Sequence, residues 1–318
     1  MSTVTQTTAT LPSGETGVSG AERPSMVRIW VMAARIRTLP AAVAPVLVGT
    51  SLALGAGEFH PLAFVAALLG AVFIQVGTNL SNDYSDARRG ADTEDRLGPV
   101  RVTAGGLVPP RQVLIATYAT FGLAVLCGVY LVAVAGPELI AVGAASILAG
   151  VLYTGGPRPY GYEGLGEVFV FLFFGVVAVT GSYFVQVQEL PWQAFGCAVP
   201  VGLLASAILV VNNVRDIDTD RRAGKRTLAV RLGRERTRAL YTAMVAGAFA
   251  SAPVLWALGM SPWLLLSWAA IPLAAGVVRT VRTRVDGPAL NGALARTGML
   301  QLLFCLLFAA GILASGGI

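Results

Sequence analysis

Charged residues are scarce in this chain of 318 residues, and this shortage excludes several classes of protein. Asp, Glu, Lys and Arg make up 13% of the sequence, which is about half of the share usual in soluble domains. The hydrophobic fraction is 55% and the mean hydropathy is +0.70. So few charges cannot cover a soluble surface, which argues against a soluble enzyme, a disordered chain and a nucleic-acid-binding domain. We therefore expect an all-α protein that crosses the membrane several times.

Histidine and cysteine are also rare, and this limits the chemistry that the chain can perform. The single histidine, His60, lies in a short turn beside a proline. Cys127, Cys197 and Cys305 each lie inside an apolar run without a nearby partner. Such cysteines are most often small buried hydrophobic residues, and neither a disulfide framework nor a zinc-ligand spacing is present. Histidine-based acid–base catalysis and histidine-rich metal sites are therefore not expected.

Nine apolar segments are long enough, or nearly so, to cross about 30 Å of hydrocarbon as helices. They cover approximately residues 39–57, 61–80, 113–135, 138–154, 167–186, 194–214, 239–258, 262–279 and 296–314. Before them, residues 1–25 are rich in Ser, Thr and Gly and contain no apolar run. We expect these residues to form a disordered cytosolic tail, and residues 26–318 to form a single transmembrane domain.

The distribution of positive charge predicts the orientation of the spans. With nine spans, all 23 Lys and Arg residues fall on one side of the membrane. The connections on the opposite side contain none and carry Glu58 and Glu189 instead. Because Lys and Arg stay in cytoplasmic connections, we expect a bacterial-type inner membrane protein with a cytoplasmic N-terminus and an outer C-terminus. The long polar connections 81–112 and 215–238 then lie at the cytoplasmic surface, where we expect the functional groups.

Two acidic clusters follow the second and the sixth apolar segment. The first reads Asn79-Leu-Ser-Asn-Asp-Tyr-Ser-Asp86, and the second reads Asn212-Asn-Val-Arg-Asp-Ile-Asp-Thr-Asp220. In each, an Asn stands four residues before the leading Asp, and spacings of three or four place side chains on one helix face. Two such clusters four helices apart suggest an internal repeat whose copies face each other across a cavity.

The aligned side chains of each cluster offer only carboxylate and amide oxygens as metal ligands, which indicates a hard cation. The aligned residues are Asn79, Asp83 and Asp86 in the first cluster and Asn212, Asp216 and Asp220 in the second. A solvated polar cap would not need an Asn one turn inside an apolar span, and desolvated carboxylates near a bilayer are costly and usually functional. Oxygen ligands suit Mg²⁺, which often binds one or two carboxylates together with substrate phosphates. The clusters therefore predict a Mg²⁺-dependent diphosphate site, with phosphate contacts from Arg101 and Lys225.

The connection 153–167 combines turn residues with aromatic ones. It contains five glycines, two prolines and three tyrosines. Glycine and proline are typical of a tight turn, but three tyrosines exceed what an aromatic belt needs. We interpret the segment as part of a lid over an aromatic substrate, with Tyr160 as a hydrogen-bonding candidate. Tyr153 either shields a cation with its π face or anchors a helix end at the membrane interface. A GxxxxGK[ST] spacing is absent, so nucleotide binding is not supported.

These motifs resemble those of the intramembrane aromatic prenyltransferases, the UbiA family. The likeness covers about residues 28–318 and includes both clusters, the 153–167 connection, Arg35-Ile-Arg-Thr-Leu-Pro40 and Gly224-Lys-Arg-Thr-Leu. In that family the two Asp-rich motifs end the second and sixth of nine helices. Within it, the chain is most similar to the members of menaquinone biosynthesis that prenylate 1,4-dihydroxy-2-naphthoate.

The resemblance implies a Mg²⁺-dependent reaction between a long-chain prenyl diphosphate and 1,4-dihydroxy-2-naphthoate. The product would be a demethylmenaquinone, with loss of CO₂ and diphosphate. Asp83, Asp216 and Tyr153 would be catalytic, with Tyr153 and Tyr160 beside the aromatic acceptor. The residues implied for Mg²⁺ are Asn79, Asp83, Asp86, Asp92, Asn212, Asp216 and Asp220, and those for the diphosphate are Arg35, Asn82, Arg101 and Lys225. Many relatives carry an Asp where this chain has Ala87, so Asp86 and Asp92 are expected to share its role.

Other functions stay open at this point. Another aromatic acceptor, such as 4-hydroxybenzoate, would change mainly the loops and leave the metal motifs intact. A secondary transporter also combines many spans, repeats and buried acids, but its site usually lies near the bilayer midplane. Here the acids cluster at the cytoplasmic ends of the spans. A passive scaffold would not need the clusters, and the DGxxAR signature of alcohol phosphotransferases does not occur.

Overall fold

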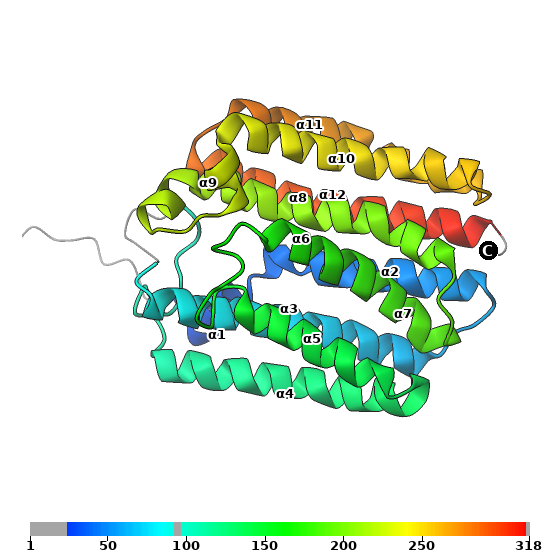
Figure 1. Ribbon diagram of the computed structural model, residues 1–318, viewed down its shortest axis with the longest axis horizontal. Coiled ribbons are helices and arrows are strands. Elements are labelled where there is room, and N and C mark those ends of the chain that lie inside the picture. The colour runs from blue at the N-terminus through cyan, green and yellow to red at the C-terminus, as the bar shows by residue number, and fades with distance from the viewer. Residues whose placement is uncertain (1–23, 92–96, 316–318) are drawn as a thin grey trace, which may run out of the picture.

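The structure describes residues 24–91 and 97–315, and this part of the chain is helical, with no strand. In the computed structural model the long helices run side by side in one bundle (Figure 1). Two short 3₁₀ helices and one π-helical stretch, labelled η, interrupt them. The elements are α1 (Met26–Ala34), η1 (Ile36–Thr38), α2 (Pro40–Gly55), α3 (Pro61–Arg88), α4 (Pro110–Ala135), α5 (Glu138–Leu152), α6 (Gly166–Val170), η2 (Phe171–Val177), α7 (Ala178–Val187), α8 (Trp192–Arg222), α9 (Leu228–Leu232), α10 (Arg234–Ala257), η3 (Pro262–Ala270), α11 (Ile271–Thr283) and α12 (Gly287–Ala314).

Seven helical stretches of the described chain are long and apolar enough to cross a membrane. An eighth is present if α1–η1 and α2 count as one span, although the two parts meet at an angle of 51°. Helix α5 has 15 residues, and at about 1.5 Å per residue it is shorter than the hydrocarbon layer. The predicted helical membrane bundle is therefore confirmed. The count of nine spans stays a prediction, and most of the predicted tail, residues 1–23, lies outside the described residues.

Helices α3 and α8 both continue past the apolar segments that predicted them. The expected spans ended at residues 80 and 214, whereas the helices run to Arg88 and Arg222. Both acidic clusters therefore lie on continuous helix. This is the condition under which a spacing of three or four residues places side chains on one face.

Helix α8 forms the centre of the bundle. Of its most apolar stretch 72% is buried, compared with 17% for α3 and α4, whose apolar surfaces face outward. It packs against α10, η2 and α12. The contact with η2 is close because glycines meet there: a Cβ added to Gly175 would lie 2.5 Å from the Cα of Gly202. Small residues of this kind let helices in a membrane approach closely.

The long connections gather at one end of the bundle. Figure 1 shows α9 and the segments that lead into α4 and α6 at the end where α3 and α8 finish, while α12 ends at the opposite end of the bundle. Helix α5 packs on α3 and α4, whereas η2 packs on α7 and α8. This arrangement brings the two acidic clusters to the same end of the molecule.

Candidate active site

One cavity of about 670 Å³ receives both acidic clusters. Of the residues singled out in the sequence, its lining includes Arg35, Asn79, Asn82, Asp86, Arg101, Tyr153, Tyr160, Asn212, Asp216, Asp220 and Lys225. Asp83 is not among the lining residues, and Asp92 lies outside the described part of the chain. The repeat of acidic clusters therefore does place carboxylates from α3 and α8 around one space.

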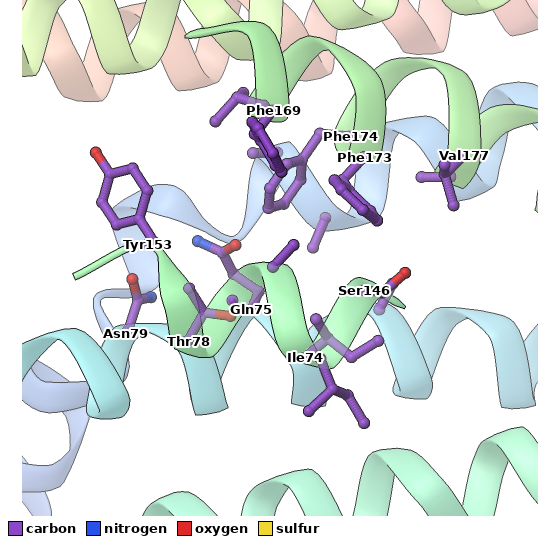
Figure 2. Close-up of a pocket in the computed structure, with 18 of the residues that line it drawn as sticks. Ile74, Gln75, Thr78, Asn79, Ser146, Tyr153, Phe169, Phe173, Phe174 and Val177 are labelled. Atoms are coloured by element: carbon purple, nitrogen blue, oxygen red, sulfur yellow. The ribbon is translucent and has the colours of Figure 1, made fainter. Parts of the chain in front are cut away.

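The cavity has a polar end and an apolar body. Figure 2 shows Asn79 and Tyr153 at one end, with Phe169, Phe173 and Val177 following along one wall. The rings of Tyr160 and Phe169 stack at 4.0 Å, and Tyr153 meets Tyr160 edge to face at 5.4 Å. An aromatic wall of this kind excludes water from the body of the cavity while its polar end carries the charged groups.

The apolar body continues to the outer surface of the bundle. Val125 and Val129 of α4 and Ile140 of α5 line the cavity, yet their exposed fractions are 50%, 62% and 62%. These side chains belong to helices whose apolar surfaces face outward. A long hydrocarbon chain bound in the cavity can therefore extend sideways into lipid.

The repeat has a different register from the one we predicted. We paired Asn79 and Asp83 with Asn212 and Asp216, but Asp83 does not line the cavity. Asn82 and Asp86 are also four residues apart, and both line the cavity as the pair on α8 does. Packing turns α3 so that Asp83 lies at the flank of this face.

Asp86 is bound by three side chains from other segments of the chain. Its Oδ2 lies 3.1 Å from Arg101 Nη2 and 3.4 Å from Lys225 Nζ. Its Oδ1 accepts a hydrogen bond of 2.7 Å from the Tyr162 hydroxyl. The same ring lies 4.9 Å below the Lys225 ammonium. Both predicted phosphate-binding cations therefore reach the polar end of the cavity, where they neutralise a carboxylate that is 1% exposed.

Tyr162 was missed in the sequence analysis as an individual residue. The only signal was the surplus of tyrosines in the 153–167 connection, where we assigned Tyr153 and Tyr160 instead. Tyr160 donates its hydroxyl hydrogen to the carbonyl oxygen of Ala149 at 2.8 Å, and burial raises its pKa above the usual value of 10. Its hydroxyl therefore ties the connection to α5, and its ring belongs to the aromatic wall.

Arg215 organises the second cluster. Its guanidinium binds Asp216 with two hydrogen bonds of 2.7 and 2.6 Å. The same group donates to the Oδ1 atoms of Asn212, at 2.8 Å, and Asn291, at 2.5 Å. Arg215 lies within the second cluster, but the sequence analysis assigned it no role. At 2% exposure it is a buried counter-ion that links the end of α8 to α12.

The segment after α8 carries Lys225 back toward α3. Asp220 lines the cavity, and its backbone carbonyl accepts a hydrogen bond of 2.8 Å from the Lys225 amide. The amide of Arg226 donates to the carbonyl of Tyr162 at 3.0 Å. The turn between α8 and α9 is therefore docked on the 153–167 connection, which brings Lys225 and Tyr162 to Asp86 together.

Another buried carboxylate, that of Glu167, lies beside the cavity on α6. Glu167 is 3% exposed, and its Oε1 accepts a hydrogen bond of 2.9 Å from Nδ2 of Asn213, which lines the cavity. Its Oε2 is buried and has no hydrogen-bond partner among the described residues. Burial of a carboxylate with one partner is costly. Glu167 is the last residue of the 153–167 connection, and the sequence analysis assigned it no role.

Arg35 occupies a strained backbone position at the entrance to α2. Its φ and ψ angles are 52° and 61°, in the left-handed region that residues other than glycine rarely adopt. It lies between α1 and η1, where the chain bends, and it lines the cavity. Strain of this kind persists where surrounding contacts determine the conformation, often at ligand-binding sites.

The oxygen-bearing side chains suit a metal ion that a substrate helps to bind. Among residues 24–91 and 97–315, no three His, Cys, Asp or Glu side chains cluster to hold a metal by themselves. Mg²⁺ commonly uses only one or two protein carboxylates, with water and phosphate oxygens completing its shell. Asp86 of α3 and Asp216 and Asp220 of α8 line the cavity, together with the amides of Asn82 and Asn212. This donor set fits Mg²⁺ when a diphosphate supplies further oxygens.

Comparisons with known proteins find relatives over most of the chain. The model of the UbiA prenyltransferase family matches residues 42–291. The chain is 45% identical to the 1,4-dihydroxy-2-naphthoate octaprenyltransferase of Mycobacterium tuberculosis, over 90% of this chain and 97% of that protein. It is 39% identical to the Escherichia coli protein of the same name, over 92% and 97%. A solved UbiA homolog from Archaeoglobus fulgidus bound to GPP and Mg²⁺ has a similar fold, with a TM-score of 0.66 at 15% identity over 90% of this chain and 99% of that one.

Proposed function

Because the chain belongs to the UbiA prenyltransferase family, we propose that it prenylates 1,4-dihydroxy-2-naphthoate. The donor is a long-chain prenyl diphosphate, and the products are diphosphate, CO₂ and demethylmenaquinol, the reduced form of a demethylmenaquinone. The observation that carries this proposal is the cavity with carboxylates and cations at one end and an aromatic, lipid-facing body. This division matches a substrate with a charged head and a hydrocarbon tail.

The protein is a multi-pass membrane protein, and its orientation belongs to the proposal. We count nine spans by adding α5 and the bent pair of α1–η1 and α2 to the seven long stretches. The segregation of Lys and Arg supports a cytoplasmic N-terminus and an outer C-terminus in a bacterial inner membrane. The polar end of the cavity then opens toward the cytoplasm, where both substrates and Mg²⁺ are available. Residues 26–318 form one catalytic domain in this proposal.

The charged end of the cavity binds the diphosphate. Arg35, Arg101 and Lys225 are the cations that line it. The two that now pair with Asp86 are close enough to the cavity to turn to phosphate oxygens. The residues that would hold Mg²⁺ are Asn79, Asn82, Asp86, Asn212, Asp216 and Asp220. When bound, the metal stabilises negative charge that develops on the departing diphosphate.

The apolar body of the cavity protects the reaction from water. The C–O bond between the allylic carbon and the diphosphate breaks, and the electron pair leaves with the diphosphate. In this proposal the ring face of Tyr153, which lines the cavity, stabilises the allylic cation, and the aromatic wall excludes water that would quench it. The carbon of the electron-rich naphthoate ring that carries the carboxylate then forms the new C–C bond. Loss of the ring carboxylate as CO₂ restores aromaticity.

Prenyl transfer by the purified protein in lipid tests this function. The protein receives a long-chain prenyl diphosphate and 1,4-dihydroxy-2-naphthoate, with Mg²⁺ or with a chelator, while CO₂ and prenylated quinol are measured. We expect Mg²⁺-dependent formation of both products. Turnover with 4-hydroxybenzoate alone would overturn the choice of acceptor but keep the reaction class. If folded protein that binds prenyl diphosphate forms no product with any acceptor, the enzymatic function is overturned and a transporter is favoured.

A further inference from the structure

The segment that carries Arg101 is a compact turn between α3 and α4. Its backbone closes on itself through hydrogen bonds from Gly105 to Arg101 at 2.9 Å and from Leu107 to Val102 at 2.9 Å. Val102 and Val108 are 0% and 1% exposed. Together with Ile29, Ala33, Leu80 and Val113 they form a small apolar cluster separate from the main core. The turn is therefore a packed unit seated against α1 and α3.

Asp83 binds this turn through its backbone. Its Oδ1 accepts a hydrogen bond of 2.9 Å from the amide of Thr103, and its Oδ2 accepts one of 3.1 Å from the amide of Val102. The carboxylate is 2% exposed. Both of its oxygens are thus engaged, and hydrogen bonds to an ionised acceptor are stronger than those between neutral groups.

These two bonds determine where Arg101 can reach. Arg101 directly precedes the two amides that Asp83 holds, and its guanidinium contacts Asp86 Oδ2 at 3.1 Å. One turn of α3 therefore holds Arg101 in two ways. Asp83 binds the backbone directly after Arg101, and Asp86 binds the Arg101 side chain. Without the anchor, the turn would lose the two backbone hydrogen bonds that join it to α3 next to Arg101.

The second cluster has a comparable arrangement at the equivalent position. Asn213 directly follows the cavity-facing Asn212, as Asp83 follows Asn82. Its Nδ2 donates to Glu167 of α6. In both clusters the residue after the cavity-facing Asn thus binds a neighbouring segment that carries or supports the site.

We propose that Asp83 is a positioning residue, which anchors the 101–103 backbone so that Arg101 covers the diphosphate end of the cavity. It is not a metal ligand in this assignment. The inference rests on the proposed function, because Arg101 has this task only if the cavity binds a diphosphate. It departs from the role that the spacing from Asn79 suggested for Asp83.

Amide hydrogen exchange in the full-length protein tests the anchor directly, without substrate. We compare Asp83→Ala with Asp216→Ala, following a peptide that spans Val102 and Thr103. We expect exchange in this peptide to accelerate at least about tenfold in Asp83→Ala, since two amides lose their acceptor, and to stay unchanged in Asp216→Ala. Unchanged exchange in a folded Asp83→Ala protein would overturn the proposal.

Kinetics distinguish positioning from metal binding. In Asp83→Ala we expect a raised KM for prenyl diphosphate and an unchanged midpoint of the Mg²⁺ titration, whereas Asp216→Ala shifts that midpoint. A shift in Asp83→Ala would make Asp83 a ligand and overturn the proposal. If Asp83→Ala does not fold, Asp83→Asn, which keeps one acceptor oxygen, replaces it with a smaller expected change in both readouts.

A double-mutant comparison tests whether Asp83 acts through Arg101. The variant Arg101→Gln removes the guanidinium, so adding Asp83→Ala to it should raise KM no further. If the two substitutions raise KM additively, Asp83 does not act through Arg101. If the wild type turns over no acceptor while the exchange result holds, the proposed function fails and the anchoring of the turn stands.

Discussion

The hydroxyl of Tyr162 provides the sharpest test of how the charged end of the cavity works. The variant Tyr162→Phe removes the hydrogen bond of 2.7 Å to Asp86 but keeps the ring beneath the Lys225 ammonium. Asp86 then depends more on Arg101 and Lys225 for neutralisation. Both cations become less available to the diphosphate, so we expect weaker binding of the prenyl donor.

The size of the effect follows from the bond that is lost. A hydrogen bond to a charged group contributes about 1.5–3 kcal/mol. Since water at the polar end of the cavity can replace part of it, we expect the lower limit, a fall of about tenfold in kcat/KM for prenyl diphosphate. The assay is the initial rate against prenyl diphosphate at saturating 1,4-dihydroxy-2-naphthoate and Mg²⁺.

Tyr84→Phe is the matched control. Tyr84 lies on the same helix as Asp86, and its hydroxyl accepts a hydrogen bond of 3.2 Å from Arg88 outside the cavity lining. We expect kcat/KM within about twofold of the wild type, as for most surface changes. Equal losses in both variants, or no loss in Tyr162→Phe, would refute the reasoning. So would equal losses from Tyr162→Phe in the wild-type and Asp86→Asn backgrounds.

Three further substitutions test other parts of the structure. Lys225→Met removes the ammonium but keeps the length of the side chain, so KM for prenyl diphosphate should rise about tenfold or more; an unchanged KM would exclude phosphate contact. Glu167→Leu leaves Nδ2 of Asn213 without its acceptor and should cost about 1–3 kcal/mol of stability, measured by thermal unfolding in detergent, whereas Glu167→Gln should unfold near the wild-type temperature. Gly175→Ala places a Cβ 2.5 Å from a Cα atom of α8 and should destabilise by about 1–3 kcal/mol, whereas Gly122→Ala, with no atom within 4 Å, should not; similar melting temperatures in both would contradict the close packing.

Composition and charge were sufficient to predict the class of fold. Hydropathy is a local property, because each span must bury its own backbone polar groups in helical hydrogen bonds. The long apolar runs therefore predicted a helical membrane bundle without any knowledge of packing. The exceptions are local as well: the chain bends by 51° between α1–η1 and α2, and α5, with 15 residues, is shorter than the hydrocarbon layer.

The recurrence of acidic clusters also predicted the main feature of the site. Helical spacing is independent of tertiary contacts, so side chains three or four residues apart had to share a face once the clusters lay on helices. That both clusters line one cavity was expected from their repetition and is what the structure has. Arg101 and Lys225 were likewise expected near the phosphates, and both reach Asp86.

The tertiary structure alone decided which of the polar residues face the cavity. Between Asn79 and Asp86 the sequence offers two pairs with a spacing of four. Only the rotation of α3 within the bundle decides that Asn79, Asn82 and Asp86 line the cavity and that Asp83 does not. Contacts between residues distant in sequence could not be predicted either: the hydrogen bond between Tyr162 and Asp86 joins residues 76 positions apart. Periodicity describes one helix at a time, whereas the direction each face takes depends on the helices packed around it.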